Sequence, residues 1–330
     1  MNQAGKPCVA VSCATEREAR EAMEEILAAV ARVAYLKDMD AERRAACLQS
    51  ARVLLSWAPH QELSPNEERQ LSSVALLQLL SAGADHLDFA RLPAKLTVAS
   101  NPGAYARPMA EHVLAMVLAH EKRLFYHHEQ LRRGVFDQMS ENKALSGATA
   151  VILGFGGIGR EVARLFKAFD MHILAINRSG RSPEPVEFLG TPAALHQVLP
   201  RADILVVALP LNRATRGLLG AREFQLMKPD AVLVNVGRGE IIDEEAFYRH
   251  LRDTPAFRAG IDAWWTEPVR HGRFEMKYPF LDLPNVLGTP HNSALAPGSL
   301  TAGVRQAAEN IRRFLLSEPL AGRVNPEEFA

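Results

Sequence analysis

Three residues in the second half of the chain, Arg238, Glu267 and His291, have side chains suited to carbonyl chemistry. Arg238 lies between two glycines in VNVGRGEIID, directly after an apolar run, where α/β folds place ligand-facing loops. A guanidinium there holds a carboxylate through two hydrogen bonds. A histidine donates a proton to a carbonyl oxygen near neutral pH, and a neighbouring carboxylate fixes its tautomer. The set predicts an acid–base pair beside an anion-binding arginine; taken singly, Glu267 and His291 are also explained as a surface acid and an ordinary loop histidine.

A glycine-rich turn in VILGFGGIG, residues 151–159, indicates that a dinucleotide binds upstream of these groups. In the G-x-G-x-x-G spacing, Gly154 permits a tight turn, Gly156 lets the backbone approach a pyrophosphate, and Gly159 lets helix and strand pack closely. The following residues share one helical face: Ile158, Val162, Leu165, Phe166 and Phe169. The turn therefore predicts a helix N-terminus aimed at a phosphate, and a strand–helix turn without ligand is the alternative.

The segment Asn177-Arg178-Ser179-Gly180-Arg181 indicates which dinucleotide binds. It follows the strand-like run MHILAIN, where an NAD site offers an acid to the ribose hydroxyls. No acid is present here, and Arg178, with Arg181, suits pairing with a 2′-phosphate. We predict that NADP(H) is preferred over NAD(H); a solvated loop arginine beside either cofactor is the alternative.

Two series of alternating strands and helices are expected to position these groups. Strand-like runs in the first half cover residues 9–13, 31–36, 51–57, 76–83 and 95–100. A second series begins with a strand at Thr149 and a helix to Phe169, and continues with strands over 171–177, 203–210, 231–236, 258–263 and 285–290 and a helix near 191–199. Between the series, residues 105–133 read as a long buried or interface helix. Residues 301–318 have helical spacing and are expected to pack back on the first domain.

Composition narrows the class of partner. Lysine plus arginine equals aspartate plus glutamate, 38 against 38, so no global charge favours a nucleic acid or a membrane surface. Cys8, Cys13 and Cys47 lack a C-x-x-C spacing and are expected to be reduced thiols. The N-terminus has no signal-peptide core, and no stretch of about 18 apolar residues occurs. We predict a cytoplasmic protein that binds neither nucleic acid nor membrane, with no metal site.

Several blocks together resemble the D-2-hydroxyacid dehydrogenase family. They are GFGGIG, VALPLNRATRG, VNVGRGEIID, AGIDAWWTEP and NVLGTPHNSA, joined in the first half by LLQLLSAGADHLD and SNPGAYARPMAEHVLAMVLA. The resemblance implies a Rossmann-type doubly wound parallel sheet plus a second, flavodoxin-like α/β substrate domain. It implies that residues 1–101 and 295–330 bind substrate, and that 102–294 bind the dinucleotide.

The same resemblance implies roles for individual residues. Arg238, Glu267 and His291 form the catalytic trio, and Asp262 contacts the nicotinamide amide. The backbone of Ala82 and Gly83 meets the substrate carboxylate, together with Arg238 and His291. The remaining expected cofactor contacts are Gly157, Ile158, Asn177, Ser179, Leu209, Pro210, Thr215 and Val236.

The expected activity is reduction of a small 2-keto acid, such as glyoxylate or hydroxypyruvate, or oxidation of the D-2-hydroxy acid. Glu267 stands where formate dehydrogenases carry glutamine, and Ala82 stands near where phosphite dehydrogenases carry lysine. Two alternatives stay open: a corepressor-like protein that senses nucleotides, and a phosphoglycerate dehydrogenase. The segment 105–133 also resembles the family's dimerisation region, so a homodimer is expected. The double tryptophan Trp264-Trp265 is explained equally well by packing and by a wall of the substrate pocket.

Overall fold

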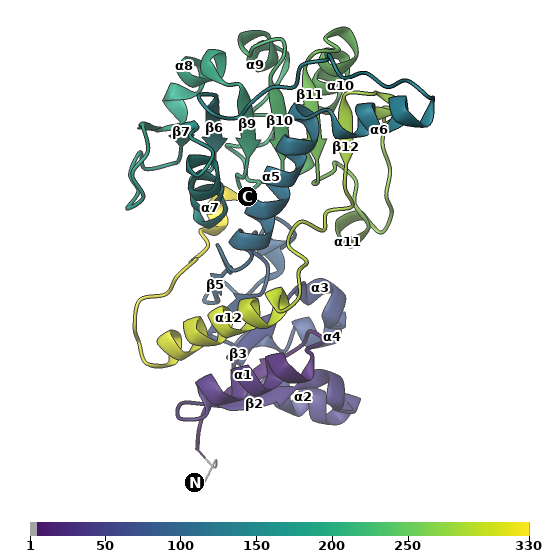
Figure 1. The fold of residues 1–330 in the computed structure, drawn as a ribbon. Coiled ribbons are helices and arrows are strands. Elements are labelled where there is room, and N and C mark those ends of the chain that lie inside the picture. The colour runs from purple at the N-terminus through teal and green to yellow at the C-terminus, as the bar shows by residue number, and fades with distance from the viewer. Residues whose placement is uncertain (1–4, 330) are drawn as a thin grey trace. The chain divides into compact units, whose positions relative to one another are not determined.

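The computed structural model describes residues 5–329 and divides the chain into two compact units. The first unit consists of Met1–Tyr105 with Ala296–Ala330, and the second of Ala106–Leu295. Both are parallel sheets flanked by helices (Figure 1), which confirms the predicted α/β fold class. The assignment of the first unit to substrate and the second to the dinucleotide stays a prediction at this point.

The first unit contains a five-stranded sheet in the order β2-β1-β3-β4-β5, the flavodoxin-like arrangement. Its strands are β1 (Cys8–Val11), β2 (Arg32–Tyr35), β3 (Ala51–Ser56), β4 (Leu76–Leu79) and β5 (Thr97–Ala99). Its helices are α1 (Arg17–Leu27), α2 (Ala41–Ser50), α3 (Pro59–Glu62), α4 (Pro65–Glu68) and α12 (Ser299–Leu315). Each predicted strand run in the first half overlaps one of these strands.

Both faces of this sheet are covered, which explains why its strands read as nearly continuous apolar runs. Val9 and Val11 of β1 join a core cluster with residues of α1 and α12, whereas Cys8 and Ala10 point to the opposite face and join a cluster with α2. Helix α12 thus packs back on the first unit, as predicted. The three cysteines are free and buried.

The second unit contains a seven-stranded parallel sheet in the order β12-β11-β10-β9-β6-β7-β8. Its strands are β6 (Thr149–Leu153), β7 (His172–Ile176), β8 (Phe188–Gly190), β9 (Ile204–Val207), β10 (Val232–Asn235), β11 (Arg258–Ile261) and β12 (Val286–Gly288). Strand order reverses beside β6, so β6 and β9 flank the switch point at which doubly wound sheets bind ligands. The doubly wound prediction is confirmed.

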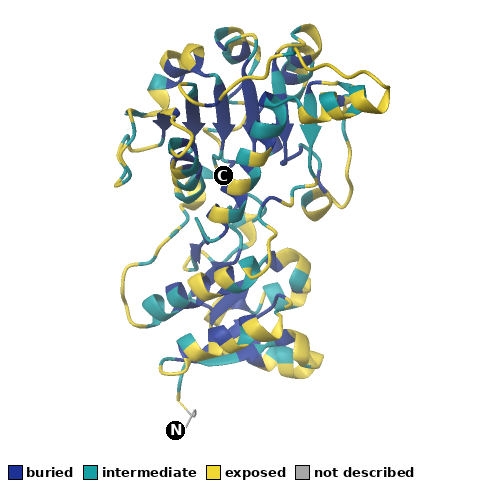
Figure 2. Cartoon of the chain, viewed as in Figure 1, coloured by how far each residue is buried: buried dark blue, intermediate teal, exposed yellow. Residues whose placement is uncertain are grey.

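Helices cover both faces of this second sheet. The helices of the second unit are α5 (Ala106–Glu121), α6 (Leu124–Arg132), α7 (Gly157–Lys167), α8 (Leu195–Val198), α9 (Ala221–Leu226), α10 (Glu244–Asp253) and α11 (Pro268–His271), of which α6 and α11 contain no buried residue. Helices α5 and α7 pack against each other on one face, and the other face forms a core cluster with α8, α9 and α10. The inner strands of both sheets are the most buried elements, whereas exposed residues gather on the outer sides of helices (Figure 2).

Three details differ from the predicted elements. The segment 105–133 is two helices rather than one, because the chain turns at Arg123, which has a left-handed φ of 48°. Helix α7 ends at Lys167, so Phe169 lies beyond it and is exposed. Strand β8 was not predicted, since its three residues are only partly buried. Among the described residues, no helix has the length and apolar character needed to cross a membrane.

Candidate active site

The predicted glycine turn lies between β6 and α7. Gly154 has φ 97°, and a Cβ there would collide with the backbone of Ala208, just after β9. A Cβ on Gly159 would collide with the Gly154 carbonyl, whereas a Cβ on Gly156 would meet nothing within 4 Å. Gly154 and Gly159 are therefore required by close packing, while Gly156, the N-cap of α7, faces open space.

This geometry fits a dinucleotide. The open backbone at Gly156 leads directly into the first turn of α7, whose amide groups have no partners within the helix. Gly157 and Ile158 lie in that turn. A bound pyrophosphate would be held here by backbone amides and the positive end of the helix dipole.

Other predicted cofactor residues lie at the carboxyl ends of neighbouring strands of the same sheet. Leu209 and Pro210 follow β9, and Val236 follows β10 and is buried. The Thr215 hydroxyl donates to the Pro210 carbonyl at 2.7 Å, which folds the segment after β9. The structure thus gathers these residues at the edge of the sheet that carries the glycine turn.

The segment after β7 is folded by its own polar side chains. Asn177 Oδ1 accepts from the Gly180 amide at 2.7 Å, and Asn177 Nδ2 donates to the Arg181 carbonyl at 2.9 Å. The Arg181 amide donates to Ser179 Oγ at 3.2 Å. Arg178 and Arg181 are both exposed. Asn177 and Ser179 therefore shape a turn that carries two arginines at the carboxyl end of β7.

Arg238 lies in an extended conformation after β10, and its two flanking glycines are needed for close backbone approach. A Cβ on Gly237 would lie 2.8 Å from the Leu209 carbonyl oxygen, and one on Gly239 would collide with the backbone of Trp264. The Asn235 side chain closes the turn, because Asn235 Nδ2 donates to the Arg238 carbonyl at 2.9 Å. The loop that carries Arg238 is thus pressed against the segments after β9 and β11.

Glu267 and His291 are in direct contact. His291 Nδ1 lies 2.8 Å from both carboxylate oxygens of Glu267, which fixes the Nδ1–H tautomer and leaves Nε2 for another partner. Glu267 Oε1 also accepts from the Trp264 amide at 2.7 Å. The Glu267 side chain is 8% exposed and that of His291 is 31% exposed. Glu267 is extended before Pro268, as its sequence context predicted.

Electrostatics link all three residues. Burial acts to raise the pKa of Glu267, but the hydrogen bond and charge of His291, the Trp264 amide and the positive charge of Arg238 outweigh it. The pKa of Glu267 therefore lies below its usual value, and the group is a carboxylate near neutral pH. Gly239, next to Arg238, meets the backbone of Trp264, and the Trp264 amide donates to Glu267, so the loop that carries Arg238 lies beside the Glu267–His291 pair. The catalytic roles of the three residues stay a prediction.

His291 has an unusual backbone that Asp262 helps to hold. His291 has φ 52°, a left-handed conformation that is rare and costly for a residue other than glycine. The fully buried Asp262 accepts from the next two amides, those of Asn292 at 3.1 Å and Ser293 at 3.3 Å. The structure shows that Asp262 fixes the turn that presents His291, and its predicted contact with the nicotinamide amide stays a prediction.

Two further residues near this turn were not predicted. The Thr289 hydroxyl donates to Asp262 Oδ1 at 2.6 Å, and His112 Nε2 lies 3.1 Å from the same hydroxyl. Since Thr289 gives its hydrogen to Asp262, His112 donates to Thr289. His112 belongs to α5 and is 177 positions from Thr289, so no local spacing signalled the contact.

The two tryptophans pack into the core of the second unit. Trp264 Nε1 donates to the Thr289 carbonyl at 2.8 Å, and Trp265 Nε1 donates to the Ile242 carbonyl at 2.7 Å. The Trp265 ring stacks on Phe280 with centroids 5.1 Å apart. Of the two explanations for this pair, the structure favours packing.

Ala82 and Gly83 belong to the first unit, in the loop after β4. The Ser81 hydroxyl donates to the Gly83 carbonyl at 2.8 Å, and the Asn101 amide donates to the Ser81 carbonyl at 2.8 Å. Both residues are partly exposed at the carboxyl end of that sheet. Their assignment to the substrate carboxylate stays a prediction.

A doubly wound sheet with this glycine turn and a carboxylate–imidazole–guanidinium set defines a nicotinamide-dependent oxidoreductase. The family model for the D-isomer specific 2-hydroxyacid dehydrogenase, NAD binding domain, matches residues 114–293. The chain belongs to the D-isomer specific 2-hydroxyacid dehydrogenase family, whose members act on CH–OH groups with NAD(P).

Named relatives agree with this assignment. The chain is 31% identical to the glyoxylate reductase of Aeropyrum pernix over 269 residues, which cover 78% of each protein. It is 31% identical over 251 residues to the D-3-phosphoglycerate dehydrogenase of Methanocaldococcus jannaschii, covering 74% of this chain but 46% of that protein. The chain therefore spans less than half the length of that relative. The crystal structure of a D-isomer specific 2-hydroxyacid dehydrogenase family protein from Aeromonas salmonicida has a TM-score of 0.78 at 27% identity, covering 97% of this chain and 99% of that one.

Proposed function

We propose that this protein reduces a small 2-keto acid, such as glyoxylate or hydroxypyruvate, with NADPH as the preferred reductant. The observation that carries the proposal is the contact between His291 and Glu267 beside the loop that carries Arg238. The bound nicotinamide nucleotide supplies the hydride. The protein's own groups must bind the acid, orient its carbonyl and deliver a proton.

The three residues divide these tasks by their chemistry. Arg238 binds the substrate carboxylate and polarises the carbonyl, because a guanidinium offers several donors in one plane. His291 donates the proton on Nε2 to the developing alkoxide, since Nδ1 is committed to Glu267. Glu267 keeps its contact with Nδ1, so the ring that has given up its Nε2 proton is left as the neutral Nδ1–H tautomer. In this proposal the backbone of Ala82 and Gly83 gives further hydrogen bonds to the carboxylate.

The preference for NADPH rests on the turn after β7. No acidic side chain follows β7 within Asn177–Arg181, so nothing there repels a 2′-phosphate or pairs with free ribose hydroxyls. Arg178 and Arg181 are exposed on a turn that Asn177 and Ser179 fold. These arginines pair with the 2′-phosphate in this proposal.

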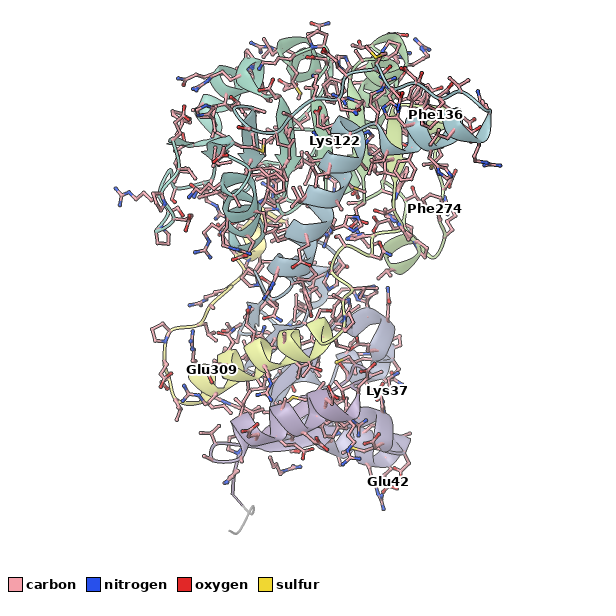
Figure 3. All side chains as sticks on the ribbon, viewed as in Figure 1. Lys37, Glu42, Lys122, Phe136, Phe274 and Glu309 are labelled. Carbon is pink, nitrogen blue, oxygen red and sulfur yellow. The ribbon has the colours of Figure 1, made fainter. Side chains whose placement is uncertain are left out.

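A homodimer is supported by an exposed apolar segment in the second unit. None of the residues of α6 is buried. The large apolar side chains exposed on α6 and just after it are Leu124, Phe125, Tyr126, Leu131, Val135, Phe136 and Met139. Figure 3 shows Phe136 on the segment that extends beyond α6. Apolar surface of this kind is unfavourable in water and is typical of a protein interface. We assign it to a second copy of the chain.

A substrate panel tests the activity. Initial rates are measured with glyoxylate, hydroxypyruvate and phosphohydroxypyruvate, each with NADPH and with NADH. The proposal predicts the highest kcat/KM for glyoxylate or hydroxypyruvate with NADPH. A higher value for phosphohydroxypyruvate would favour the phosphoglycerate dehydrogenase that one relative's name suggests. Tight NADPH binding without turnover of any keto acid would contradict the proposal in favour of a nucleotide sensor.

A further inference from the structure

Two charged residues that closely follow the proposed catalytic residues form an ion pair with each other. Arg270 Nη1 donates to Glu240 Oε2 at 2.9 Å, and Arg270 Nη2 lies 2.8 Å from Glu240 Oε1. Two parallel contacts between a guanidinium and a carboxylate fix orientation as well as distance. The side chains are 15% and 16% exposed, so solvent screens this pair less than it screens a surface pair.

On one side the pair anchors the segment that carries Glu267. Glu267 is the N-cap of α11, which is only four residues long and cannot be stable by itself. The Glu267 amide donates to His271 Nδ1 at 3.0 Å within the same short helix. The position of the Glu267 carboxylate therefore depends on what holds α11 against the rest of the second unit, and Arg270 provides such a contact.

On the other side the pair anchors the loop that carries Arg238. Glu240 lies two residues after Arg238, and its carbonyl accepts from the Gly217 amide at 2.8 Å. Between them, Gly239 approaches the Trp264 backbone so closely that a Cβ would not fit. The loop after β10 and the segment after β11 are thus joined at two places, by backbone contact at Gly239 and by the ion pair.

We propose that Glu240 and Arg270 are positioning residues that hold Arg238 and Glu267 in register with each other. The inference rests on the proposed function for the roles of Arg238 and Glu267. Neither Glu240 nor Arg270 touches the reacting atoms in this proposal. Small displacements matter here, because a misplacement of about 1 Å at a reacting centre costs about a hundredfold in rate. The same pair is also consistent with a purely stabilising contact, so the test must separate position from stability.

The experiment compares Glu240→Gln, Arg270→Met and the double variant with a matched control in the same unit. The control is Glu121→Gln in the pair Arg258–Glu121, whose side chains are 15% and 4% exposed and lie at the amino end of β11. Three quantities are measured on the full chain: kcat and KM for glyoxylate with saturating NADPH, the Kd for NADPH, and the melting temperature. Amide hydrogen exchange is followed in peptides covering residues 237–242 and 264–271.

The proposal predicts that each single variant lowers kcat/KM by about tenfold to a hundredfold, because both displace the same pair of groups. The Kd for NADPH is expected to change less than about twofold. The double variant loses no more than the worse single variant, since the two residues act as one unit. Exchange rises in both peptides when either residue is changed. Glu121→Gln removes the charge from the other buried pair and should leave both kcat/KM and the exchange of these two peptides unchanged.

Additive losses, or a lower melting temperature with unchanged kcat/KM, would overturn the positioning role. An increase in amide hydrogen exchange only in the peptide that carries the mutation would also overturn the positioning role. The exchange readout needs no turnover, so the two proposals fail separately. If the wild type reduces no keto acid, the proposed function fails, and coupled exchange of the two peptides still decides whether the pair holds them together.

Discussion

His291 combines a strained backbone with a side chain that is fixed at one ring nitrogen. The left-handed conformation costs about 1–3 kcal/mol, which the surrounding contacts must offset. Asp262 offsets part of it through the Asn292 and Ser293 amides, and Glu267 fixes the ring. This arrangement aims Nε2 in one direction at the expense of local stability, as is typical of functional sites.

Replacing His291 or Glu267 should impair proton transfer and leave cofactor binding nearly unchanged. We expect His291→Gln to lower kcat by about 10²–10⁴, because general acid catalysis contributes that much, while the Kd for NADPH stays nearly unchanged. Glu267→Gln keeps the shape and should cost less, since the imidazole remains. Steady-state kinetics and NADPH fluorescence titration measure both. Undiminished turnover in His291→Gln would remove His291 from the mechanism.

The lowered pKa of Glu267 predicts a pH-dependent contribution to stability. A carboxyl group whose pKa is lower in the folded state than in the unfolded state stabilises the fold at any pH above its unfolded-state pKa. This stabilisation is lost as the pH falls through the folded-state pKa. The contribution should therefore be complete at neutral pH and decline below the ordinary glutamate pKa of 4.5. Melting temperatures of the wild type and Glu267→Gln, measured from pH 7 down to pH 3, should converge on acidification. A constant difference across that range would contradict the assignment.

At the scale of elements, the glycine turn offers two substitutions with opposite expected effects. Gly156→Ala places a Cβ in open space at an ordinary φ of −90°, so we expect little change in melting temperature. The methyl group would occupy the backbone surface that a pyrophosphate approaches, so the Kd for NADPH should rise by about tenfold or more. Gly154 has φ 97°, and a Cβ there would collide with the backbone of Ala208, so Gly154→Ala should instead destabilise the second unit. Equal NADPH affinity in Gly156→Ala and wild type would argue against cofactor binding at this turn.

The sequence predicted elements where one local signal dominated. Buried strands such as β1 and β6 read as apolar runs, and the glycine turn marked the start of α7. The break between α5 and α6 at Arg123 was not predicted, because arginine has no preference for the left-handed conformation that it adopts there. Contacts such as His112–Thr289 and Arg270–Glu240 were also missed. They join residues far apart in the chain, and periodicity carries information only about near neighbours.

At the scale of the whole molecule, the exposed apolar side chains of the second unit suggest that the folded chain is not the complete assembly. Phe136 is 74% exposed and Met139 is 87% exposed. The formal net charge of the chain is zero, so charge repulsion does not keep two copies of the chain apart. Surface of this kind lowers the free energy when a partner covers it.

Replacing two of these side chains with charged ones should therefore dissociate the proposed dimer. We expect Phe125→Asp/Phe136→Asp to elute as a monomer in size-exclusion chromatography with light scattering, because burying two unpaired carboxylates at an interface is strongly unfavourable. The matched control is Leu295→Asp, at a leucine of the same unit that is 76% exposed and lies outside the segment 124–139. This control should keep the wild-type mass. A monomeric wild type, or a double variant that keeps the dimer mass, would show that α6 and its extension do not form the interface, and the exposed phenylalanines would then require a partner of another kind.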